Sequence, residues 1–589
     1  MAALLLFKFY TRQEVPLLPS LQFYQPLHSD ASILAFERSR RGSLSDFAIG
    51  IERLPVSFSN GGFGLLGAAL AAPSGLFPFP FPFPGPHEPP SPHPGPPVLP
   101  PIFPFPNPPS PQHPKSNLPA RYPPLPGPEH PKPLDHSVKA ALEALGRSPD
   151  SFRAPGTVPF PHLPHGTDSI PGIKHFVFLM MENHSFDNMM GVLTRPDIDG
   201  FEFDRNGVPK GTQPGANGTT QHWFETPFPC QNEDMVSQEW TTSHNAFNNG
   251  SLNGGVVNPI DHTKTGASGP FSMSYFTPRV MPAWFALMEQ VTIADRWFCS
   301  ALAQTWPTRM FSLAATSRGV TATGQNEDGI FWPNKTIFNK LDEFGISWKV
   351  AWNSTENTTG NTTAIFNGTI SKESMKEHIF DYETFYKDCA TGDLPSFYYL
   401  DQRGSATTQE PAKNMALGEN LIYNIVKAMM TGPKWKETLF LINYDEHGGF
   451  ADHVPPPPAI APDDVEPIGK PGEFQYEGFH RLGFRVPAAV ISPYGKKNFV
   501  SHTVYDHTSM LAFMERKWNL PAMTYRDANA NSIEDMIDFE AMSKGKPTFP
   551  SWEQLRIPLP LLQVPGNDAL NCANTPLTPP PESVTGGHR

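Results

Sequence analysis

Uninterrupted apolar runs that stop at polar residues recur along the central part of the chain. One run, 439–444, ends in the carboxylates Asp445 and Glu446, which a histidine and a Gly-Gly turn follow. Another run, 173–181, ends in the polar pair at 182–183. Short apolar runs that are rich in β-branched and aromatic residues predict strands that are buried on both faces. We therefore expect two buried strands, each of which ends in a polar loop.

Helix-like and strand-like segments alternate through the rest of this region. Apolar residues at helical spacing and helix-boundary residues predict helices at 283–291, 336–345, 414–432 and 506–521. Further strands are predicted at 346–352, 394–401 and 484–495, and a turn is predicted at Trp306 and Pro307. This alternation predicts an α/β fold with a mostly parallel central sheet that helices cover on both faces.

Proline content divides the chain into parts. Residues 73–135 hold a large share of the 70 prolines, and a segment of this kind lacks amide donors and cannot form a core. We expect a leader or poorly defined segment at 1–72, a Pro-rich disordered arm at 73–135 and a linker at 136–164. A large globular domain, which would carry any catalytic site, follows at 165–565, and a Thr/Pro-rich tail at 566–589. A domain of this length can bury a large core.

Charge and cysteine usage narrow the class of protein. The net charge is -13 and no basic run is present, which argues against nucleic acid as the main partner. No apolar run approaches the length of a membrane-spanning helix. The four cysteines have no metal-type spacing, so they either form two disulfides or stay as buried thiols: Cys230, Cys299, Cys389 and Cys572.

Glycosylation triplets indicate the compartment. Seven N-x-S/T triplets begin at Asn217, Asn249, Asn334, Asn353, Asn357, Asn361 and Asn367. Their density favours a secreted, extracellular glycoprotein. An eighth triplet at Asn183 lies inside the polar strand end and is not expected to be modified. The N-terminus fits less well, because the signal-like pattern at 62–75 lies far inside the chain. We hypothesise that the first sixty residues are either a gene-model artefact or a leader.

The polar strand ends suggest a metal site. Asp445 and Glu446 can both turn toward one ion where a strand leaves the sheet, and Glu182 and Asn183 repeat this arrangement. Paired carboxylates repel each other unless a cation or a shared proton neutralises them. A solvated acidic turn is the plainer alternative. Oxygen donors without a nearby cysteine favour a hard cation over a structural zinc.

Histidines are numerous, and most must be structural. Five of the 20 stand beside polar residues in loops that carry Gly, Pro or Asp: His244, His447, His453, His502 and His507. A single histidine in such a loop is more often a hydrogen-bonding core residue than a catalyst. The sequence pattern alone therefore selects none of them.

Five segments, taken together, resemble the phosphoesterase family of phosphatidylcholine-type phospholipases C and related acid phosphatases, within the alkaline-phosphatase-like superfamily. They are FVFLMMENHSFDNMMG, DRWFCSALAQTWPTRMF, TIFNKLDEFGISWKV, LINYDEHGGFADHVPPP and FRVPAAVISPYGKKNFVSHTVYDHTSML, in that order over residues 173 to about 540. The resemblance implies an alkaline-phosphatase-like fold. It also implies a metal-dependent phosphoesterase that hydrolyses phosphodiester bonds of phospholipids, and the glycosylation triplets add that this enzyme is secreted.

The resemblance also assigns roles to residues. It implies a divalent metal ion of unspecified identity held by Glu182, Asn183, Asp445, Glu446 and Thr305. Thr305 matches the family's nucleophile, which coordination to a cation would activate toward a phosphothreonine intermediate. His244 matches a histidine that protonates the leaving alkoxide.

Two departures from the family pattern bear on substrate and rate. Relatives carry an Asp-x-His-Pro segment before the acidic pair, whereas this chain has Glu410 before Pro411, and a carboxylate repels a phosphoryl oxygen. Residues 307–309 read Pro-Thr-Arg where relatives commonly have Pro-Asn-Arg.

Three functions remain open on this basis. The first is a phospholipase-C-like enzyme that acts on phospholipids and touches the membrane surface transiently. The second is an acid phosphatase for small phosphomonoesters. The third is a catalytically impaired surface or binding protein.

Overall fold

The computed structural model describes most residues between 136 and 565. The chain divides into the units Met1–Gly95 and Pro96–Arg589, and all described residues belong to the second. The described residues are 136–215, 218–231, 236–258, 269–324, 335–352, 377–402, 407–411, 413–468 and 476–565. The predicted leader, Pro-rich arm and tail lie outside them. The proposed division of the chain into five parts therefore stays a prediction.

An eight-stranded sheet forms the centre of this unit. Its strands are β1 (His175–Met181), β6 (Thr292–Ala294), β7 (Trp348–Ala351), β8 (Ile379–Phe380), β9 (Phe397–Asp401), β10 (Thr438–Tyr444), β11 (Ala488–Ile491) and β12 (Val500–Ser501). They lie in the order β12-β6-β11-β10-β1-β9-β7-β8. Only β11 pairs antiparallel with its neighbours in this sheet. The prediction of a mostly parallel sheet is confirmed.

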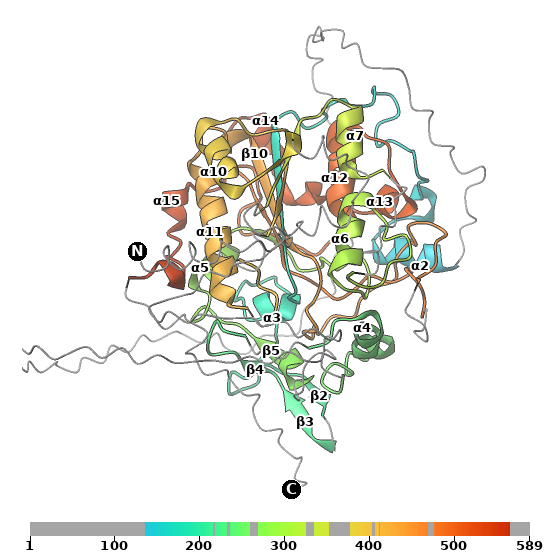
Figure 1. Ribbon diagram of the computed structural model, residues 1–589, viewed down its shortest axis with the longest axis vertical. Coiled ribbons are helices and arrows are strands. Elements are labelled where there is room, and N and C mark those ends of the chain that lie inside the picture. Colours follow the sequence, from blue (N-terminus) through green and yellow to red (C-terminus); the bar gives the residue numbers. More distant parts are fainter. Residues whose placement is uncertain are drawn as a thin grey trace, which may run out of the picture. The chain divides into compact units, whose positions relative to one another are not determined.

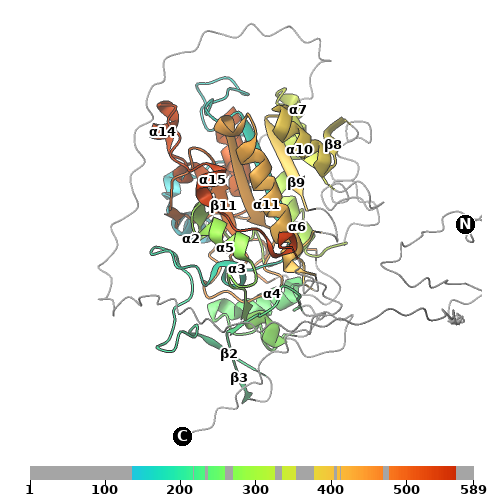
Figure 2. The same cartoon turned by 90° about the vertical axis from the view of Figure 1, so that its left-hand side faces the viewer.

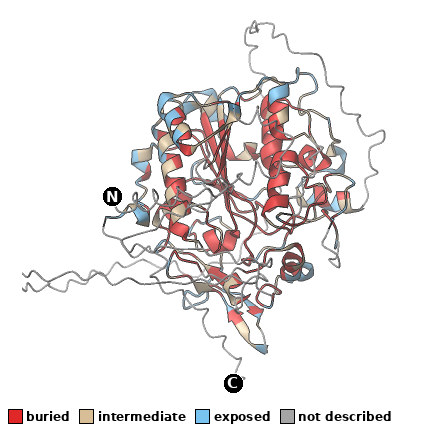
Figure 3. Cartoon of the chain, viewed as in Figure 1, coloured by how far each residue is buried: buried red, intermediate tan, exposed pale blue. Residues whose placement is uncertain are grey.

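Helices cover both faces of the sheet. The α-helices are α2 (His136–Ala144), α3 (Phe186–Met190), α4 (Trp240–Phe247), α5 (Pro282–Met288), α6 (Thr305–Ala314), α7 (Ile337–Glu343), α10 (Tyr382–Thr391), α11 (Met415–Thr431), α12 (Thr508–Trp518), α13 (Tyr525–Asn529), α14 (Phe539–Ser543) and α15 (Trp552–Leu555). Helices α5, α10 and α11 lie on one face, and α6, α7 and α12 on the other (Figures 1 and 2). Apart from the edge strand β8, whose two residues are half-buried, the strands and the inner sides of these helices are mostly buried (Figure 3).

The carboxyl edge of the sheet carries a separate layer of short elements. The excursion after β1 contains β2 (Thr212–Pro214), β3 (Thr220–His222), β4 (Phe224–Glu225) and, further along, β5 (Ser274–Tyr275). These strands and helix α4 lie below the sheet in Figure 1, on the side where α3 follows β1. In an open α/β sheet, ligands bind at this edge.

Most predicted elements are present, but the predicted turn at Trp306 and Pro307 is wrong. Both residues lie in the first turn of α6, which begins at Thr305. The first residues of a helix have no intrahelical partner for their N–H groups, so a proline there costs little. The Trp-Pro pair therefore begins a helix.

The segment that the sequence predicts to be a linker packs on the domain. Side chains of α2, such as Leu142, share a buried apolar cluster with Ile460 and Tyr525. Arg147 Nη1 also donates a hydrogen bond to the Asn529 carbonyl at 2.6 Å. Residues 136–164 are thus fastened to the α13 region.

The described cysteines differ in their bonding. Cys299 and Cys389 are free and buried, so two disulfides do not form, whereas Cys230 is disulfide-bonded.

Within the described part of the chain, no helix has both the length and the apolar character needed to cross a membrane.

Candidate active site

The register of two neighbouring strands brings the predicted metal ligands together. Met181 of β1 pairs with Tyr444 of β10, so Glu182 and Asp445 leave the sheet side by side. The backbone N–H of Asn183 donates to Asp445 Oδ1 at 3.0 Å. Its side-chain Nδ2 donates to the Glu446 carboxylate. Glu182 and Asn183 thus form one cluster with Asp445 and Glu446. The hydrogen-bonded residues are 262 and 263 positions apart in the chain.

Local backbone geometry allows this close approach. Asn183 has a φ of 68°, a left-handed conformation that Asn tolerates better than most residues. Gly448 has a φ of 64°, and a Cβ atom there would lie 2.0 Å from the Asn183 carbonyl oxygen. The Gly448 N–H donates to Glu446 Oε2 at 2.7 Å. The Gly-Gly turn therefore positions the Glu446 side chain.

Arg309 contacts the ends of three strands, and the sequence pattern does not predict these contacts. Its Nε donates to Asp445 Oδ2 at 3.0 Å and its Nη1 to Asp401 Oδ1 at 2.8 Å. Nη2 lies 3.6 Å from Glu182 Oε2. Asp401 ends β9, the other neighbour of β1. The strand prediction at 394–401, which ends in this aspartate, was the one available signal.

Thr305 is the first residue of α6, one helical turn before Arg309. Residues four apart on a helix share a face, so the Arg309 contacts hold the helix start near the strand ends. Thr305 is buried, with 5% of its surface exposed. The amino end of a helix carries partial positive charge and favours anions such as phosphate.

Burial sets the electrostatics of the cluster. It raises the pKa of the Glu182 carboxyl well above its usual range, and the Asp445 and Glu410 charges add to the rise, against Arg309. Burial also raises the pKa of Glu446 well above its usual range, and the Asp445 charge adds to it. For Asp445, burial raises the pKa, while Arg309 opposes the rise. Arg309 pairs with the carboxylates of Glu182, Asp401 and Asp445, and Glu446 adds a fourth carboxylate to the cluster, so the cluster favours a further cation or a proton.

Unpaired oxygen atoms point to a cation. Asn183 Oδ1 and Glu182 Oε2 are buried and have no hydrogen-bond partner among the described residues, although Glu182 Oε2 lies 3.6 Å from Arg309 Nη2. Buried polar atoms without a partner are costly, and a bound ion is one usual explanation. The oxygen donor set suits a hard divalent cation. These observations fit a metal ion, although the ligand assignment itself stays a prediction.

A second acidic cluster lies close by and is already neutralised. It consists of Asp187, Asp452 and His453, whose possible ligand atoms all lie within 4.8 Å of one another. Arg485 donates to Asp452 at 2.8 Å and to Asp187 at 3.0 Å. The guanidinium occupies the centre of this cluster, so we interpret it as a buried ion-pair network that braces the loops.

His244 lies on α4, and its neighbours in the chain reach the cluster and the loop that follows it. Gln238, just before this helix, accepts a hydrogen bond from Asn183 Nδ2 at 2.7 Å. The Oγ atom of Ser243, the residue before His244, lies 3.0 Å from His447 Nε2. His244 is buried, and burial lowers its pKa to about 4. Its imidazole is therefore neutral near pH 7 in the absence of substrate.

The remaining candidate histidines hold the fold. His447 Nδ1 lies 3.1 Å from the Phe450 carbonyl oxygen, and His507 Nε2 lies 2.6 Å from that of Asp445. His453 pairs with Asp187 at 2.7 Å, and His502 with Asp295 at 2.9 Å. Each has a structural partner.

Glu410 lies where its charge reaches the site. It is half-buried, and its carboxylate contributes to the raised pKa of both Glu182 and Glu446, after burial as the main cause. The departure from the family pattern thus places a further negative charge near the predicted metal ligands.

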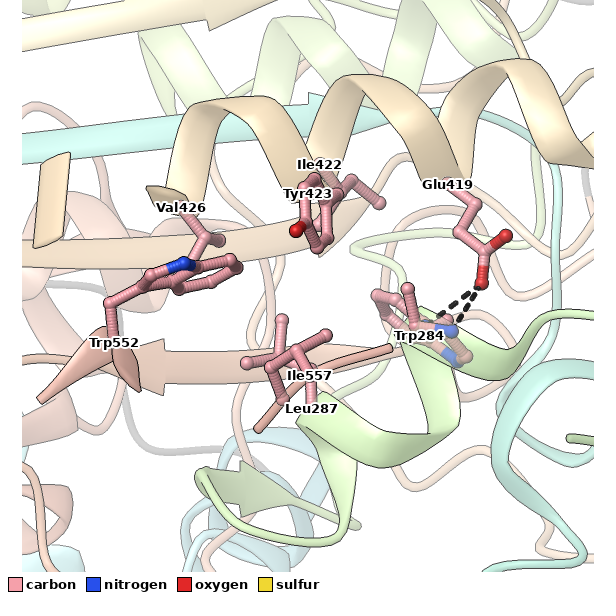
Figure 4. A pocket seen from close by; sticks show the side chains of 9 residues that line it. Trp284, Leu287, Glu419, Ile422, Tyr423, Val426, Trp552 and Ile557 are labelled. Atoms are coloured by element: carbon pink, nitrogen blue, oxygen red, sulfur yellow. Dashed lines mark hydrogen bonds between the residues drawn. The ribbon is translucent and has the colours of Figure 1, made fainter. Parts of the chain in front are cut away.

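A cavity elsewhere in the domain is too small for a substrate. It lies between α5, α11 and α15, and its lining includes Trp284, Tyr423 and Trp552 (Figure 4). Its volume of about 10 Å³ matches what one water molecule needs. Glu419 in its wall accepts hydrogen bonds from Ala283 N at 2.8 Å and Trp284 N at 3.0 Å, which fastens the start of α5.

Known proteins resemble most of this domain. The sequence model of the Phosphoesterase family matches residues 173–521. Non-specific phospholipase C4 of Arabidopsis thaliana is 31% identical over 405 residues, which cover 63% of this chain and 73% of that protein. Phospholipase C B of Mycobacterium tuberculosis (strain CDC 1551 / Oshkosh) is 27% identical over 431 residues, 64% of this chain and 80% of that protein.

A solved structure shows a much weaker similarity. A protein in the alkaline phosphatase superfamily from Vibrio parahaemolyticus has 10% sequence identity and a TM-score of 0.31, over 66% of this chain and 74% of that chain. The sequence matches therefore carry the assignment by themselves. The chain belongs to the phosphoesterase family and is a hydrolase that acts on phosphoric ester bonds, similar to phospholipases C.

Proposed function

We propose that this protein is a secreted, metal-dependent phospholipase C that hydrolyses phospholipid diesters through a phosphothreonine intermediate. The observation that carries the proposal is the gathering of Glu182, Asn183, Asp445 and Glu446 at adjacent strand ends, fastened through Arg309 to the helix that Thr305 begins. Its relatives in Arabidopsis thaliana and Mycobacterium tuberculosis are named as phospholipases C.

Five residues would hold the metal ion in this proposal. They are Glu182, Asn183, Thr305, Asp445 and Glu446. A divalent cation bound there would neutralise phosphate charge and lower the pKa of the Thr305 hydroxyl. Apart from this ion and solvent water, the groups that act in the reaction are side chains of this chain.

The first step forms a bond between Thr305 Oγ and phosphorus. The hydroxyl proton leaves to solvent, and the bond between phosphorus and the diacylglycerol oxygen breaks in line with the attack. Protonated His244 gives its proton to the leaving oxygen, which departs as an alcohol. Water then attacks the phosphothreonine and loses a proton to solvent, the Thr305 oxygen leaves and takes a proton from solvent, and solvent reprotonates His244.

Charge near the phosphate favours diesters over monoesters. Glu410 adds a negative charge near Glu182 and Glu446. A dianionic monoester is repelled more strongly by a carboxylate than a monoanionic diester is. Exposed aromatic side chains on the excursion after β1, such as Phe203 and Phe228, support transient contact with a membrane surface.

Substitution of the nucleophile tests this function. Thr305→Ala should lower kcat on phosphatidylcholine vesicles by at least about a thousandfold, because the attacking oxygen is lost. Thr305→Ser keeps a hydroxyl and should retain measurable turnover. Chelation should abolish activity, and added divalent cation should restore it. Headgroup release is measured across a panel of phospholipid diesters and one phosphomonoester.

Three outcomes of this assay would count against the proposal. Undiminished activity of the Thr305→Ala protein would remove the nucleophile assignment. Faster turnover of the monoester than of every diester would favour an acid phosphatase. Absence of turnover with every substrate and metal would favour a binding protein on this fold.

Secretion is proposed on two grounds. The glycosylation triplets are dense, and Cys230 is disulfide-bonded. Disulfides persist mainly in oxidising compartments. We place the protein outside the cell on this basis.

A further inference from the structure

The imidazole of His244 is covered by a tyrosine from a distant loop. The rings of His244 and Tyr476 are parallel within 8°, and their centroids are 4.0 Å apart. Tyr476 lies more than two hundred positions later in the chain, directly after a segment outside the described residues. It is 39% exposed, whereas His244 is buried. Tyr476 therefore lies between one face of the imidazole and solvent.

Two further contacts fix the orientation of the imidazole. Nδ1 lies 2.7 Å from the Trp240 carbonyl oxygen, so Nδ1 carries a hydrogen and donates it. The Trp240 ring lies 4.4 Å from the imidazole, at an interplanar angle of 52°. With Nδ1 engaged by the backbone, Nε2 is the nitrogen that can exchange a proton with a substrate.

The turn that presents Tyr476 is held firmly in an unfavourable conformation. Tyr476 has a φ of 48°, which is uncommon for an aromatic residue and costs free energy. The turn is anchored by Arg481, which donates to Glu477 at 2.5 Å, and by the burial of Phe479. Phe479 packs against Trp240, with ring centroids 5.7 Å apart. Strain of this kind persists only where the surroundings enforce it.

From these contacts we infer that Tyr476 is a positioning residue, which holds the His244 imidazole so that Nε2 faces the leaving oxygen of the substrate. The inference rests on the proposed function, because it requires His244 to be the general acid. Proton transfer requires a defined donor geometry, and each contact on the imidazole restricts rotation about its side-chain bonds. Tyr476 adds a contact on a ring face to the two contacts that Trp240 supplies.

Substrates with different leaving groups separate positioning from general damage. Dihexanoyl phosphatidylcholine expels a diacylglycerol alkoxide, which needs a proton, whereas p-nitrophenyl phosphorylcholine expels a stable phenolate, which does not. His244→Ala should lower kcat on the first about a hundredfold and on the second less than about threefold. Tyr476→Ala should show the same selectivity with a loss of about tenfold, and Tyr476→Phe should retain wild-type rates because the ring remains.

Controls make the comparison specific. Phe539→Ala removes an aromatic side chain of similar exposure, 37%, from α14 and should leave the ratio of the two rates unchanged. Tyr476→Leu keeps apolar bulk in case Tyr476→Ala does not fold, and it should show the same selective loss. In a His244→Ala background, Tyr476→Ala should cause no further loss on either substrate.

Distinct results would overturn the inference and the proposed function. If His244→Ala keeps its selectivity, equal losses on both substrates, or no loss, in Tyr476→Ala and Tyr476→Leu would overturn the inference. Equal effects of His244→Ala on both substrates would overturn the general-acid role, and the inference with it. Failure of the wild-type protein to turn over either substrate would overturn the proposed function itself.

Discussion

At the residue scale, burial decides how each titratable group can act. His244 packs against the Trp240 and Tyr476 rings, and its burial lowers its pKa to about 4. The Glu477 charge opposes the change and the Arg481 charge adds to it. Sequence alone placed His244 only through family resemblance, because a histidine in a helix gives no sign of what will cover it.

This burial predicts an acid-shifted rate profile. Only protonated imidazole can donate to an alkoxide, and with a pKa of about 4 the protonated fraction grows about tenfold for each unit that the pH falls between 7 and 5. We therefore expect kcat/KM for dihexanoyl phosphatidylcholine to rise as the pH falls over this window. The nitrophenyl substrate should show a flat profile, and His244→Ala should remove the slope. A rate that rises toward alkaline pH would contradict the assignment.

At the element scale, strands were easier to predict than the helix that carries the nucleophile. Apolar runs such as 173–181 and 439–444 predicted β1 and β10 correctly because their side chains are buried on both faces. Helix α6 was missed at its start, because Trp306 and Pro307 have the local pattern of a turn. The contacts of Arg309 with Asp401 and Asp445 join this helix to the sheet, and no local pattern encodes them.

The Arg309 contacts predict a large effect on stability. Arg309→Met should lower the free energy of unfolding by about 3–5 kcal/mol, because it leaves buried carboxylates without a counter-charge. Arg309→Lys should cost less, since it keeps the charge but loses the planar fork. The urea midpoint, followed by tryptophan fluorescence, measures both.

A matched control uses an exposed arginine. Arg279 pairs with Glu225 at 2.7 Å, and its side chain is 61% exposed. Arg279→Met should cost less than about 1 kcal/mol, because surface ion pairs contribute little. Equal midpoints for Arg309→Met and Arg279→Met would contradict the role given to the buried network.

At the scale of the whole molecule, secretion predicts attached glycans. Asn249 is exposed and described, whereas the other six predicted acceptor sites lie outside the described residues. Protein secreted from a eukaryotic host should lose mass on treatment with peptide-N-glycosidase, and Asn249→Gln should remove one glycan. Asn183 should remain unmodified, because it is fully buried and its Nδ2 is hydrogen-bonded to Gln238.

Mass spectrometry of the intact protein and its peptides gives the result. Sequencing of the mature N-terminus from the same sample would also locate the predicted leader. Secreted protein without any glycan would contradict the interpretation of the triplets, and retention inside the cell would contradict the localisation.

The sequence by itself determined the fold class, the family and the residue types of the site. Apolar runs and polar strand ends are local features, so they can be identified without knowledge of the partners across the sheet. Tertiary structure alone decided that the Met181–Tyr444 register would join Glu182 to Asp445, that Arg309 would fasten α6 to three strand ends, and that Tyr476 would cover His244. These contacts join residues far apart in the chain, and their energy comes from burial that exists only once the sheet and its carboxyl-edge loops have formed.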